Sequence, residues 1–205
     1  IDLYQIHRWD YETPIEETLG ALNDAVRSGK VRYLGASSMY AYQFAKALHV
    51  ADRNGWTRFV TMQPHYNLIY REEEREMLRL CREEKIGVLP WSPLARGKLA
   101  RPWSAQGSTD RDKVDKVSGI LYAKTEDADR KVIDAVENVA KQRGLPMSQI
   151  ALAWLRQQPV VTAPIVGATK LAHLDDAIGS LEVTLGSEEL EMLESPYIPH
   201  SISIG

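Results

Sequence analysis

The sequence predicts an α/β fold in which short strands alternate with amphipathic helices. Short apolar runs alternate along the 205 residues with segments whose apolar residues recur at helical spacing. Four of the five predicted strands also lie about thirty residues apart, and each is followed by a helix. Repeated β-α units imply parallel strands with right-handed crossovers. A doubly wound sheet and a β/α barrel both satisfy this pattern, and the spacing alone does not separate them.

The first β-α unit has clear local signals. Residues 1–7 form an apolar run that predicts a strand. Thr13 is the expected N-cap of the following helix, with Pro14 in its first turn and Glu16 as the capping-box partner. Gly29 is the expected stop. The helical spacing between these signals rests on Ile15, Leu19, Leu22 and Val26.

The remaining elements follow the same alternation. The other predicted strands are 31–38, 59–63, 86–92 and 162–168. The other predicted helices are 41–55, 73–85, 127–144, 146–159, 171–181 and 186–195. A polar interruption rich in Lys, Asp, Ser and Gly runs from Arg96 to about Asp129, and long loops of this kind usually cover a binding site. Because no linker is visible, we expect residues 1–205 to form a single domain.

Composition excludes several classes of function. The chain is 44% hydrophobic and 26% charged, with a net charge of -3 and no basic stripe, so nucleic acid is not expected as a partner. No apolar stretch approaches the roughly 18 residues of a membrane span. The single cysteine, Cys81, forms no disulfide, which fits a reducing cytoplasm. No His/Cys/Asp cluster suggests a metal site.

Polar and small residues follow the predicted strands, at the positions where parallel β/α folds place their chemistry. His7 follows the first strand, Ser37 and Ser38 end the second, and Gln63 ends the third. The segment "PWSPLARGK" ends the fourth strand, and "GATK" ends the fifth. Structural alternatives remain: a hydrogen-bonded core histidine for His7, a turn-capping role for Ser37, and core packing for Trp91.

Five segments together resemble a known family. "HRWD", "GASS", "MQPHYNLIYRE", "PWSPLARGKL" and "PIVGATK" occur in the order and spacing of the aldo-keto reductases. The chain is similar to the C-terminal part of such a protein, in the aryl-aldehyde-reductase-like branch. The resemblance implies a (β/α)8 TIM barrel. Residues 1–205 would supply about strands 4–8 of it, and the first three β-α units would be absent from this sequence.

The resemblance also implies roles for the strand-end residues. His7 would polarise and orient the substrate carbonyl. Ser38 and Gln63, with Ser37 beside them, would hold the nicotinamide carboxamide, because an amide needs both a donor and an acceptor. Trp91 would stack on the nicotinamide ring. The expected pyrophosphate loop comprises Ser92, Leu94, Ala95, Gly97 and Lys98. The expected adenosine 2'-phosphate site comprises Gly167, Thr169, Lys170, His173 and Asp176, and it favours NADPH over NADH.

The function that the resemblance implies is NADPH-dependent reduction of aldehydes or ketones to alcohols, with a small carbonyl compound as the substrate. In the family the proton donor is a Tyr assisted by a Lys and an Asp, all from the N-terminal half. We therefore expect the 205 residues alone to reduce no aldehyde. The alternative is a non-catalytic cofactor-binding regulatory subunit or scaffold of the same fold. The sequence predicts neither the particular substrate nor the oligomeric state.

Overall fold

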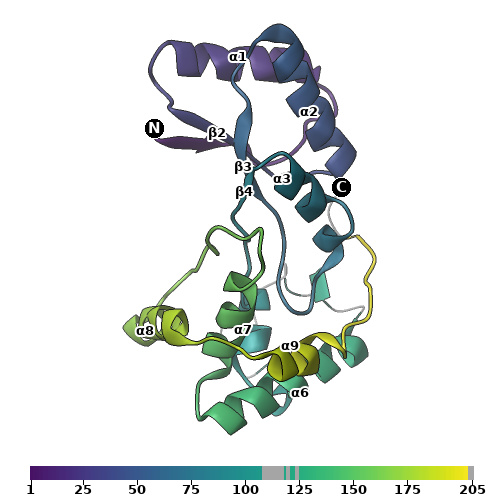
Figure 1. The fold of residues 1–205 in the computed structure, drawn as a ribbon, viewed down its shortest axis with the longest axis vertical. Coiled ribbons are helices and arrows are strands. Elements are labelled where there is room, and N and C mark those ends of the chain that lie inside the picture. Colours follow the sequence, from purple (N-terminus) through teal and green to yellow (C-terminus); the bar gives the residue numbers. More distant parts are fainter. Residues whose placement is uncertain (108–117, 119–120, 123–124, 203–205) are drawn as a thin grey trace. The chain divides into compact units, whose positions relative to one another are not determined.

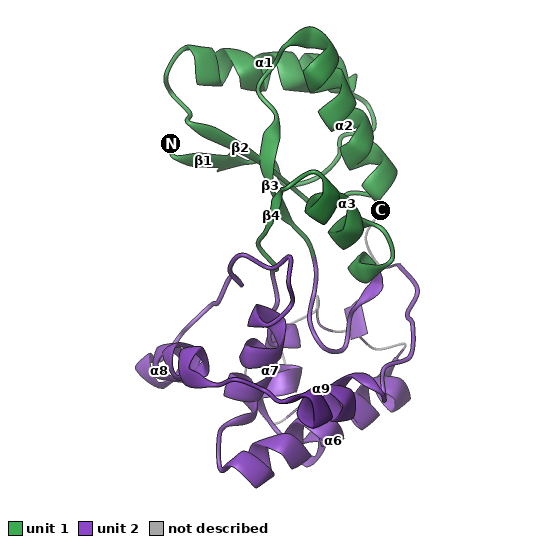
Figure 2. Ribbon diagram, in the orientation of Figure 1, with its two compact units in different colours: residues 1–64, 73–90, 204–205 green, residues 65–72, 91–203 purple. Residues whose placement is uncertain are grey.

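The computed structural model describes residues 1–107, 118, 121–122 and 125–202 (Figure 1). The chain forms two compact units (Figure 2). Unit 1 contains Ile1–Pro64, Glu73–Pro90 and Ile204–Gly205, and unit 2 contains His65–Glu72 and Trp91–Ser203. The expectation of a single domain over residues 1–205 stays a prediction.

Unit 1 is a parallel β-α structure. Its sheet has four strands in the order β1 (Leu3–Gln5), β2 (Tyr33–Ser37), β3 (Phe59–Gln63) and β4 (Gly87–Val88). All three neighbouring pairs are parallel. Helices α1 (Ile15–Arg27), α2 (Ala41–Asn54) and α3 (Met77–Glu83) alternate with the strands. The predicted alternation of strands and helices is therefore confirmed over residues 1–90.

The core of unit 1 lies on one face of this sheet. The strand residues Ala36, Met62 and Val88 are fully buried, and the register places them side by side across neighbouring strands. The ring of Phe44 from α2 lies 6.0 Å from that of Phe59 on β3, so α2 packs on this face. Burial of these apolar side chains supplies the main stabilisation of the unit.

The start of α1 differs from the prediction. The helix begins at Ile15, and the N-cap position is occupied by Pro14 rather than Thr13. The Thr13 hydroxyl instead donates a hydrogen bond to the Asp10 carboxylate at 2.7 Å. A short polar side chain can bond either the helix or a neighbouring turn, and here the turn at Asp10 is the stronger partner.

Unit 2 is built around helices. It contains α6 (Glu126–Arg143), α7 (Met147–Arg156), α8 (Leu171–Gly179) and α9 (Ser187–Glu194), with short 3-10 turns at Ala95–Ala100, Trp103–Ala105 and Ser180–Glu182. Helix α7 forms the centre, because eight of its ten residues are buried. Its Trp154 is fully buried, and the indole N–H donates to the Glu194 carboxylate of α9 at 2.8 Å.

The predicted fifth strand, residues 162–168, is wrong. The sheet has four strands, and residues 162–168 join no ladder in the part of the chain that the structure describes. A strand exists only where its backbone groups pair with a neighbouring strand, and the apolar run "TAPIVGA" finds no such partner. Over the described residues, the five predicted strands are corrected to the four strands of this sheet. Part of the interruption predicted between Arg96 and Asp129 lies outside the described residues.

Over the described ranges, no helix combines the length and the apolar character that crossing a membrane requires.

Candidate active site

In unit 1 the sheet brings three of the predicted residues together. Ser37 and Gln63 are register partners at the ends of β2 and β3. The Ser37 hydroxyl donates to the Gln63 carbonyl at 2.7 Å, and the Ser38 backbone N–H donates to the same carbonyl at 3.3 Å. Ser38 has a φ of 44°, a left-handed conformation that is uncommon for a residue other than glycine. Backbone strain of this kind often marks a functional site.

The two serines therefore have different roles. Ser37 is buried, and its hydroxyl holds the backbone of β3, which is a structural contact between strands and not the turn-capping role considered from the sequence. Ser38 is half-buried, and its Oγ lies 3.3 Å from the Ser37 Oγ. Of the two, Ser38 has the exposure that a ligand contact requires.

His7 lies at the same edge of the sheet. It follows β1, which pairs in parallel with β2, so its backbone leaves the sheet on the side where Ser37 ends β2. The neighbouring Ile6 backbone N–H still donates to the Gly35 carbonyl at 3.0 Å. The His7 side chain is exposed, which excludes the buried core histidine considered as its alternative. An exposed imidazole can donate a hydrogen bond to a bound carbonyl.

In unit 2, Trp91 opens a tightly wound loop. The indole ring stacks on the ring of His65, with centroids 4.2 Å apart and planes inclined by 12°. The chain then adopts positive φ angles at Ser92, Ala95, Arg96 and Gly97. Ala95 and Leu99 are buried and anchor the loop to the core. The ammonium group of Lys98 lies 5.8 Å from the centre of the Trp103 ring.

Two backbone N–H groups of this loop are hydrogen-bonded within it, since Ala95 donates to the Ser92 carbonyl at 2.9 Å and Gly97 donates to the Leu94 carbonyl at 2.8 Å. Ser92 and Gly97 are half-buried, whereas Ala95 is fully buried. The pyrophosphate-binding role that the resemblance implied for this loop stays a prediction.

The predicted 2'-phosphate residues lie at the start of α8. Gly167, Thr169, Lys170 and His173 are exposed, and Lys170 occupies the N-cap position of the helix. Asp176 is different, since its carboxylate accepts a hydrogen bond from the Ser148 hydroxyl at 3.1 Å.

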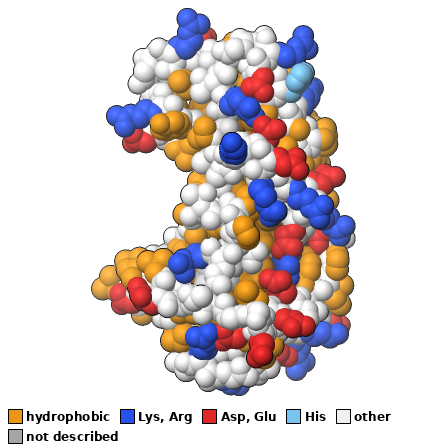
Figure 3. Space-filling view, in the orientation of Figure 1, with side chains coloured by type: hydrophobic (Ala, Val, Ile, Leu, Met, Phe, Trp, Pro, Cys, Tyr) orange, Lys and Arg blue, Asp and Glu red, His pale blue; other side chains and the backbone are white. Residues whose placement is uncertain are grey.

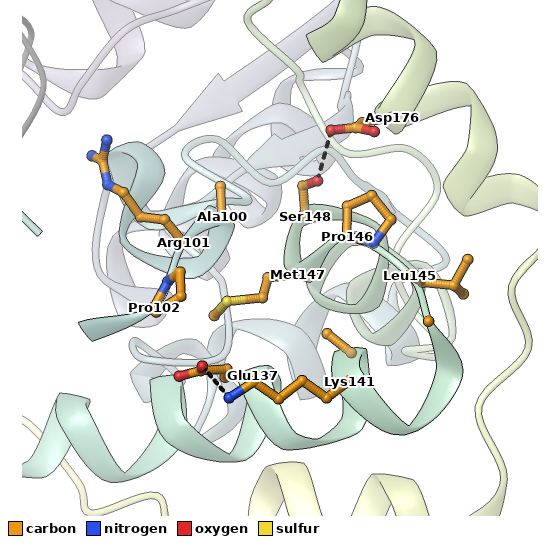
Figure 4. A pocket seen from close by; sticks show the side chains of 12 residues that line it. Ala100, Arg101, Pro102, Glu137, Lys141, Leu145, Pro146, Met147, Ser148 and Asp176 are labelled. Atoms are coloured by element: carbon orange, nitrogen blue, oxygen red, sulfur yellow. Dashed lines mark hydrogen bonds and ion pairs between the residues drawn. The ribbon is translucent and has the colours of Figure 1, made fainter. Parts of the chain in front are cut away.

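Asp176 also lines a pocket of about 390 Å³ in unit 2 (Figure 4). Arg101, Met147 and the ion-paired side chains of Glu137 and Lys141 also line this pocket (Figure 4). Within this pocket the Asp176 carboxylate is a hydrogen-bond acceptor. Arg101, which follows the 92–98 loop in the sequence, lines the same pocket.

Sequence reasoning missed a buried polar cluster behind Trp91. His65 is 1% exposed, and its Nε2 lies 2.7 Å from the Tyr122 hydroxyl. The Asn67 amide donates to the Tyr122 hydroxyl at 3.2 Å and to the Ser92 carbonyl at 2.9 Å. The letters "PHYN" directly after a strand end were a signal, but they did not reveal which residues they contact.

The C-terminal segment is tied to unit 2 by further buried polar contacts. The Tyr197 hydroxyl donates to the Glu72 carboxylate at 2.7 Å, and the His200 backbone N–H donates to the same carboxylate at 2.6 Å. The His200 imidazole bonds the Asp129 carboxylate at 2.8 Å. These hydrogen bonds fasten residues 197–200 to the rest of unit 2.

Comparison with known proteins decides the family. The model of the aldo/keto reductase family matches residues 1–198. The chain belongs to the aldo/keto reductase family. It is 47% identical over 206 residues to versiconal hemiacetal acetate reductase of Aspergillus parasiticus, which covers 100% of this chain and 60% of the relative.

Two further aldo-keto reductases show the same degree of likeness. The chain is 46% identical over 198 residues to one from Alternaria alternata, with 96% of this chain and 52% of the relative covered. It is 45% identical over 203 residues to one from Metarhizium robertsii, with 98% and 54% covered. The chain thus spans between about half and 60% of the length of these relatives.

Proposed function

We propose that this chain carries the cofactor-binding part of an NADPH-dependent oxidoreductase that reduces aldehydes or ketones to alcohols. Membership of the aldo/keto reductase family over residues 1–198 carries the proposal. The names of the relatives, a versiconal hemiacetal acetate reductase among them, describe reductases. The substrate we propose for the present protein is a small carbonyl compound.

The residues on each unit fit a dinucleotide cofactor. Gln63 offers an amide donor and acceptor to the nicotinamide carboxamide, and Ser38 adds a hydroxyl. Trp91 offers a flat ring for the nicotinamide. The loop 92–98 would contact the pyrophosphate, to which Lys98 offers a positive charge. The exposed cation of Lys170 suits a phosphate.

The bound cofactor would supply a hydride to the carbonyl carbon. His7 would donate a hydrogen bond to the carbonyl oxygen, which polarises the bond and stabilises negative charge developing on that oxygen. Gln63, Ser38 and Trp91 would fix the orientation of the nicotinamide ring. We assign the protonation of the oxygen to no residue of this chain, so we propose that the 205 residues bind NADPH without reducing an aldehyde.

A titration of the purified 205-residue chain with NADPH tests the proposal. We expect saturable binding, detected as quenching of tryptophan fluorescence or by calorimetry. The variant Trp91→Leu should weaken the affinity about tenfold, because an aromatic platform for the ring is lost. Trp56→Leu, which changes a tryptophan of unit 1 outside the proposed site, should not. Absence of NADPH binding by the wild-type chain would contradict the proposal.

An assay of NADPH oxidation with an aromatic aldehyde tests the second statement. We expect no turnover by the 205-residue chain. Turnover by a chain verified to begin at Ile1 would show that the chain contains its own proton donor. Cofactor binding without reduction by a longer natural form that includes the family's Tyr and Lys would favour the regulatory alternative instead.

The preference for NADPH has its own test at Lys170. The variant Lys170→Ala should raise the Kd for NADPH about tenfold, because a charge-assisted contact to the 2'-phosphate is lost, and should leave the Kd for NADH unchanged. The control Lys131→Ala removes an exposed lysine of α6 and should change neither value. Equal effects of Lys170→Ala on both cofactors would argue against a 2'-phosphate contact.

A further inference from the structure

We propose that His65 is a positioning residue for Trp91: its imidazole is the middle layer of a three-ring stack, Tyr70–His65–Trp91, that fixes the plane of the indole on which the nicotinamide would lie. The proposal rests on the proposed function for the role of Trp91. The position of His65 itself is independent of that function.

The stack is defined by ring geometry. The His65 ring lies 4.3 Å from Tyr70 with planes inclined by 15°, and 4.2 Å from Trp91 with planes inclined by 12°. The three planes are therefore close to parallel. A parallel β-bridge between His65 and Trp91 fixes the two backbones opposite each other. Since His65 is almost fully buried, its ring has little freedom to leave this position.

An edge contact fixes the rotation of the imidazole about its own bond. Tyr122 meets the His65 ring edge-on, with centroids 5.7 Å apart and planes inclined by 67°, and its hydroxyl lies 2.7 Å from Nε2. The Asn67 amide, which can only donate through its nitrogen, donates to this hydroxyl and to the Ser92 carbonyl. One cluster thus holds both the indole of Trp91 and the backbone of the residue that follows it.

These contacts also assign the tautomer of His65. The Asn67 amide nitrogen, which only donates, also lies 3.3 Å from Nε2 of His65, so we infer that Nε2 is unprotonated and accepts from the Tyr122 hydroxyl. The ring proton then resides on Nδ1, a buried atom without a hydrogen-bond partner among the described residues. This buried N–H group without a partner is unfavourable. A phenylalanine ring at position 65 would have no such unsatisfied donor.

The charge state of the His65 imidazole also supports its role in positioning Trp91. Burial, assisted by the charge of Arg96, lowers the pKa of His65 to about 3, and burial raises the pKa of Tyr122. Tyr70 contacts the opposite face of the imidazole. The imidazole is therefore neutral at physiological pH. A neutral layer behind Trp91 leaves the indole face electron-rich, which favours the cationic nicotinamide of the oxidised cofactor.

The test uses the whole chain and two substitutions at one position. His65→Phe keeps a flat ring of similar size, and His65→Leu removes the ring but keeps apolar volume. We expect His65→Phe to bind NADPH and NADP⁺ with nearly wild-type Kd, and His65→Leu to weaken both about fivefold or more. His49→Leu, at an exposed position of α2, is the matched control and should leave both values unchanged.

Near-ultraviolet circular dichroism gives a second readout that needs no cofactor. The Trp91 band, obtained by subtracting the spectrum of Trp91→Leu, should persist in His65→Phe and collapse in His65→Leu. Nitrogen NMR of the wild type should show a neutral His65 protonated on Nδ1 from pH 5 to pH 8. Unchanged affinity and an unchanged Trp91 band in His65→Leu would overturn the inference.

The inference remains testable if the wild type binds no NADPH or if His65→Leu does not fold. If the wild type binds no NADPH, the proposed function fails, and the Trp91 band still tests the stack. If His65→Leu does not fold, His65→Met decides, because it also removes the ring but fills the volume with a flexible apolar side chain. It should then weaken NADPH binding and broaden the Trp91 band; wild-type values for both would refute the positioning role.

Discussion

Gly35 shows how a single residue is dictated by its neighbours across the sheet. It lies in the middle of β2, with Gln5 of β1 and Thr61 of β3 as register partners. The Thr61 hydroxyl donates to the Gln5 side-chain oxygen at 3.2 Å, directly over the place where a side chain of residue 35 would stand. A Cβ at this position would lie 2.6 Å from that Gln5 oxygen and would also overlap the Thr61 hydroxyl.

The variant Gly35→Ala should therefore destabilise unit 1. We expect the free energy of unfolding to fall by about 1–3 kcal/mol, the usual range for overpacking a filled site. Urea denaturation measures it. The control Gly20→Ala lies within α1, where a Cβ would meet the Trp56 ring at an ordinary 3.6 Å. It should be neutral or stabilising by about 0.5–1 kcal/mol. The same loss in both variants would contradict the steric explanation.

At the scale of elements, the C-terminal tail is joined to α6 by one titratable contact. His200 bonds Asp129 at 2.8 Å, and both side chains are at most 5% exposed. Burial alone lowers the pKa of His200, but the hydrogen bond and the charge of Asp129 outweigh it, so the pKa lies above its ordinary value. Tyr197 stacks on the His200 ring at 5.3 Å, and Glu72 accepts from the His200 backbone.

This contact predicts the sign of a pH effect. A raised folded-state pKa means that His200 contributes its full stabilisation below about pH 6.5, the ordinary value, and loses it as the pH rises through the folded-state pKa. The difference in Tm between the wild type and His200→Gln should be larger at pH 6 than at pH 9. His49→Gln, an exposed control on α2, should show no such dependence. A difference in Tm that is the same at both pH values would exclude a charged His200–Asp129 pair.

Across the whole chain, both units present apolar surface to solvent. Tyr33 of β2 is 58% exposed and Leu171 of α8 is 80% exposed. Among the described residues, none of those in α8 is buried, although Leu171, Leu174 and Ile178 share one face of the helix at helical spacing. Figure 3 shows hydrophobic side chains gathered over α8. Apolar patches of this kind are uncommon on the surfaces of monomeric proteins.

We therefore expect the 205-residue chain to bind the dye ANS and to self-associate at high concentration. The double variant Leu171→Glu/Leu174→Glu should lower ANS fluorescence and shift sedimentation toward the monomer. The double variant Asn138→Glu/Gln142→Glu adds the same charges to exposed positions of α6 and should have a smaller effect. If both double variants acted equally, net charge rather than the apolar face would control association.

The sequence by itself determined the helices and the composition of the strand ends. Helix ends were readable because the signals are local: α2 and α6 end at Gly55 and Gly144, each in a left-handed conformation, and Gly29 lies two residues past the end of α1. The sequence likewise showed that polar or small residues follow the apolar runs, at Ser38, at Gln63 and in the loop that begins at Trp91.

Tertiary structure alone decided which strands formed and which ring packs against the indole of Trp91. Residues 162–168 have the composition of a strand, yet strand formation depends on a pairing partner distant in sequence. His65 acquires its burial and its tautomer from Tyr122, 57 positions further along the chain. A helix is stabilised mainly by residues three and four positions apart, so local periodicity predicts it. Strand pairing and ring stacking join residues that are distant in the sequence, and a single sequence does not show which of these residues come into contact.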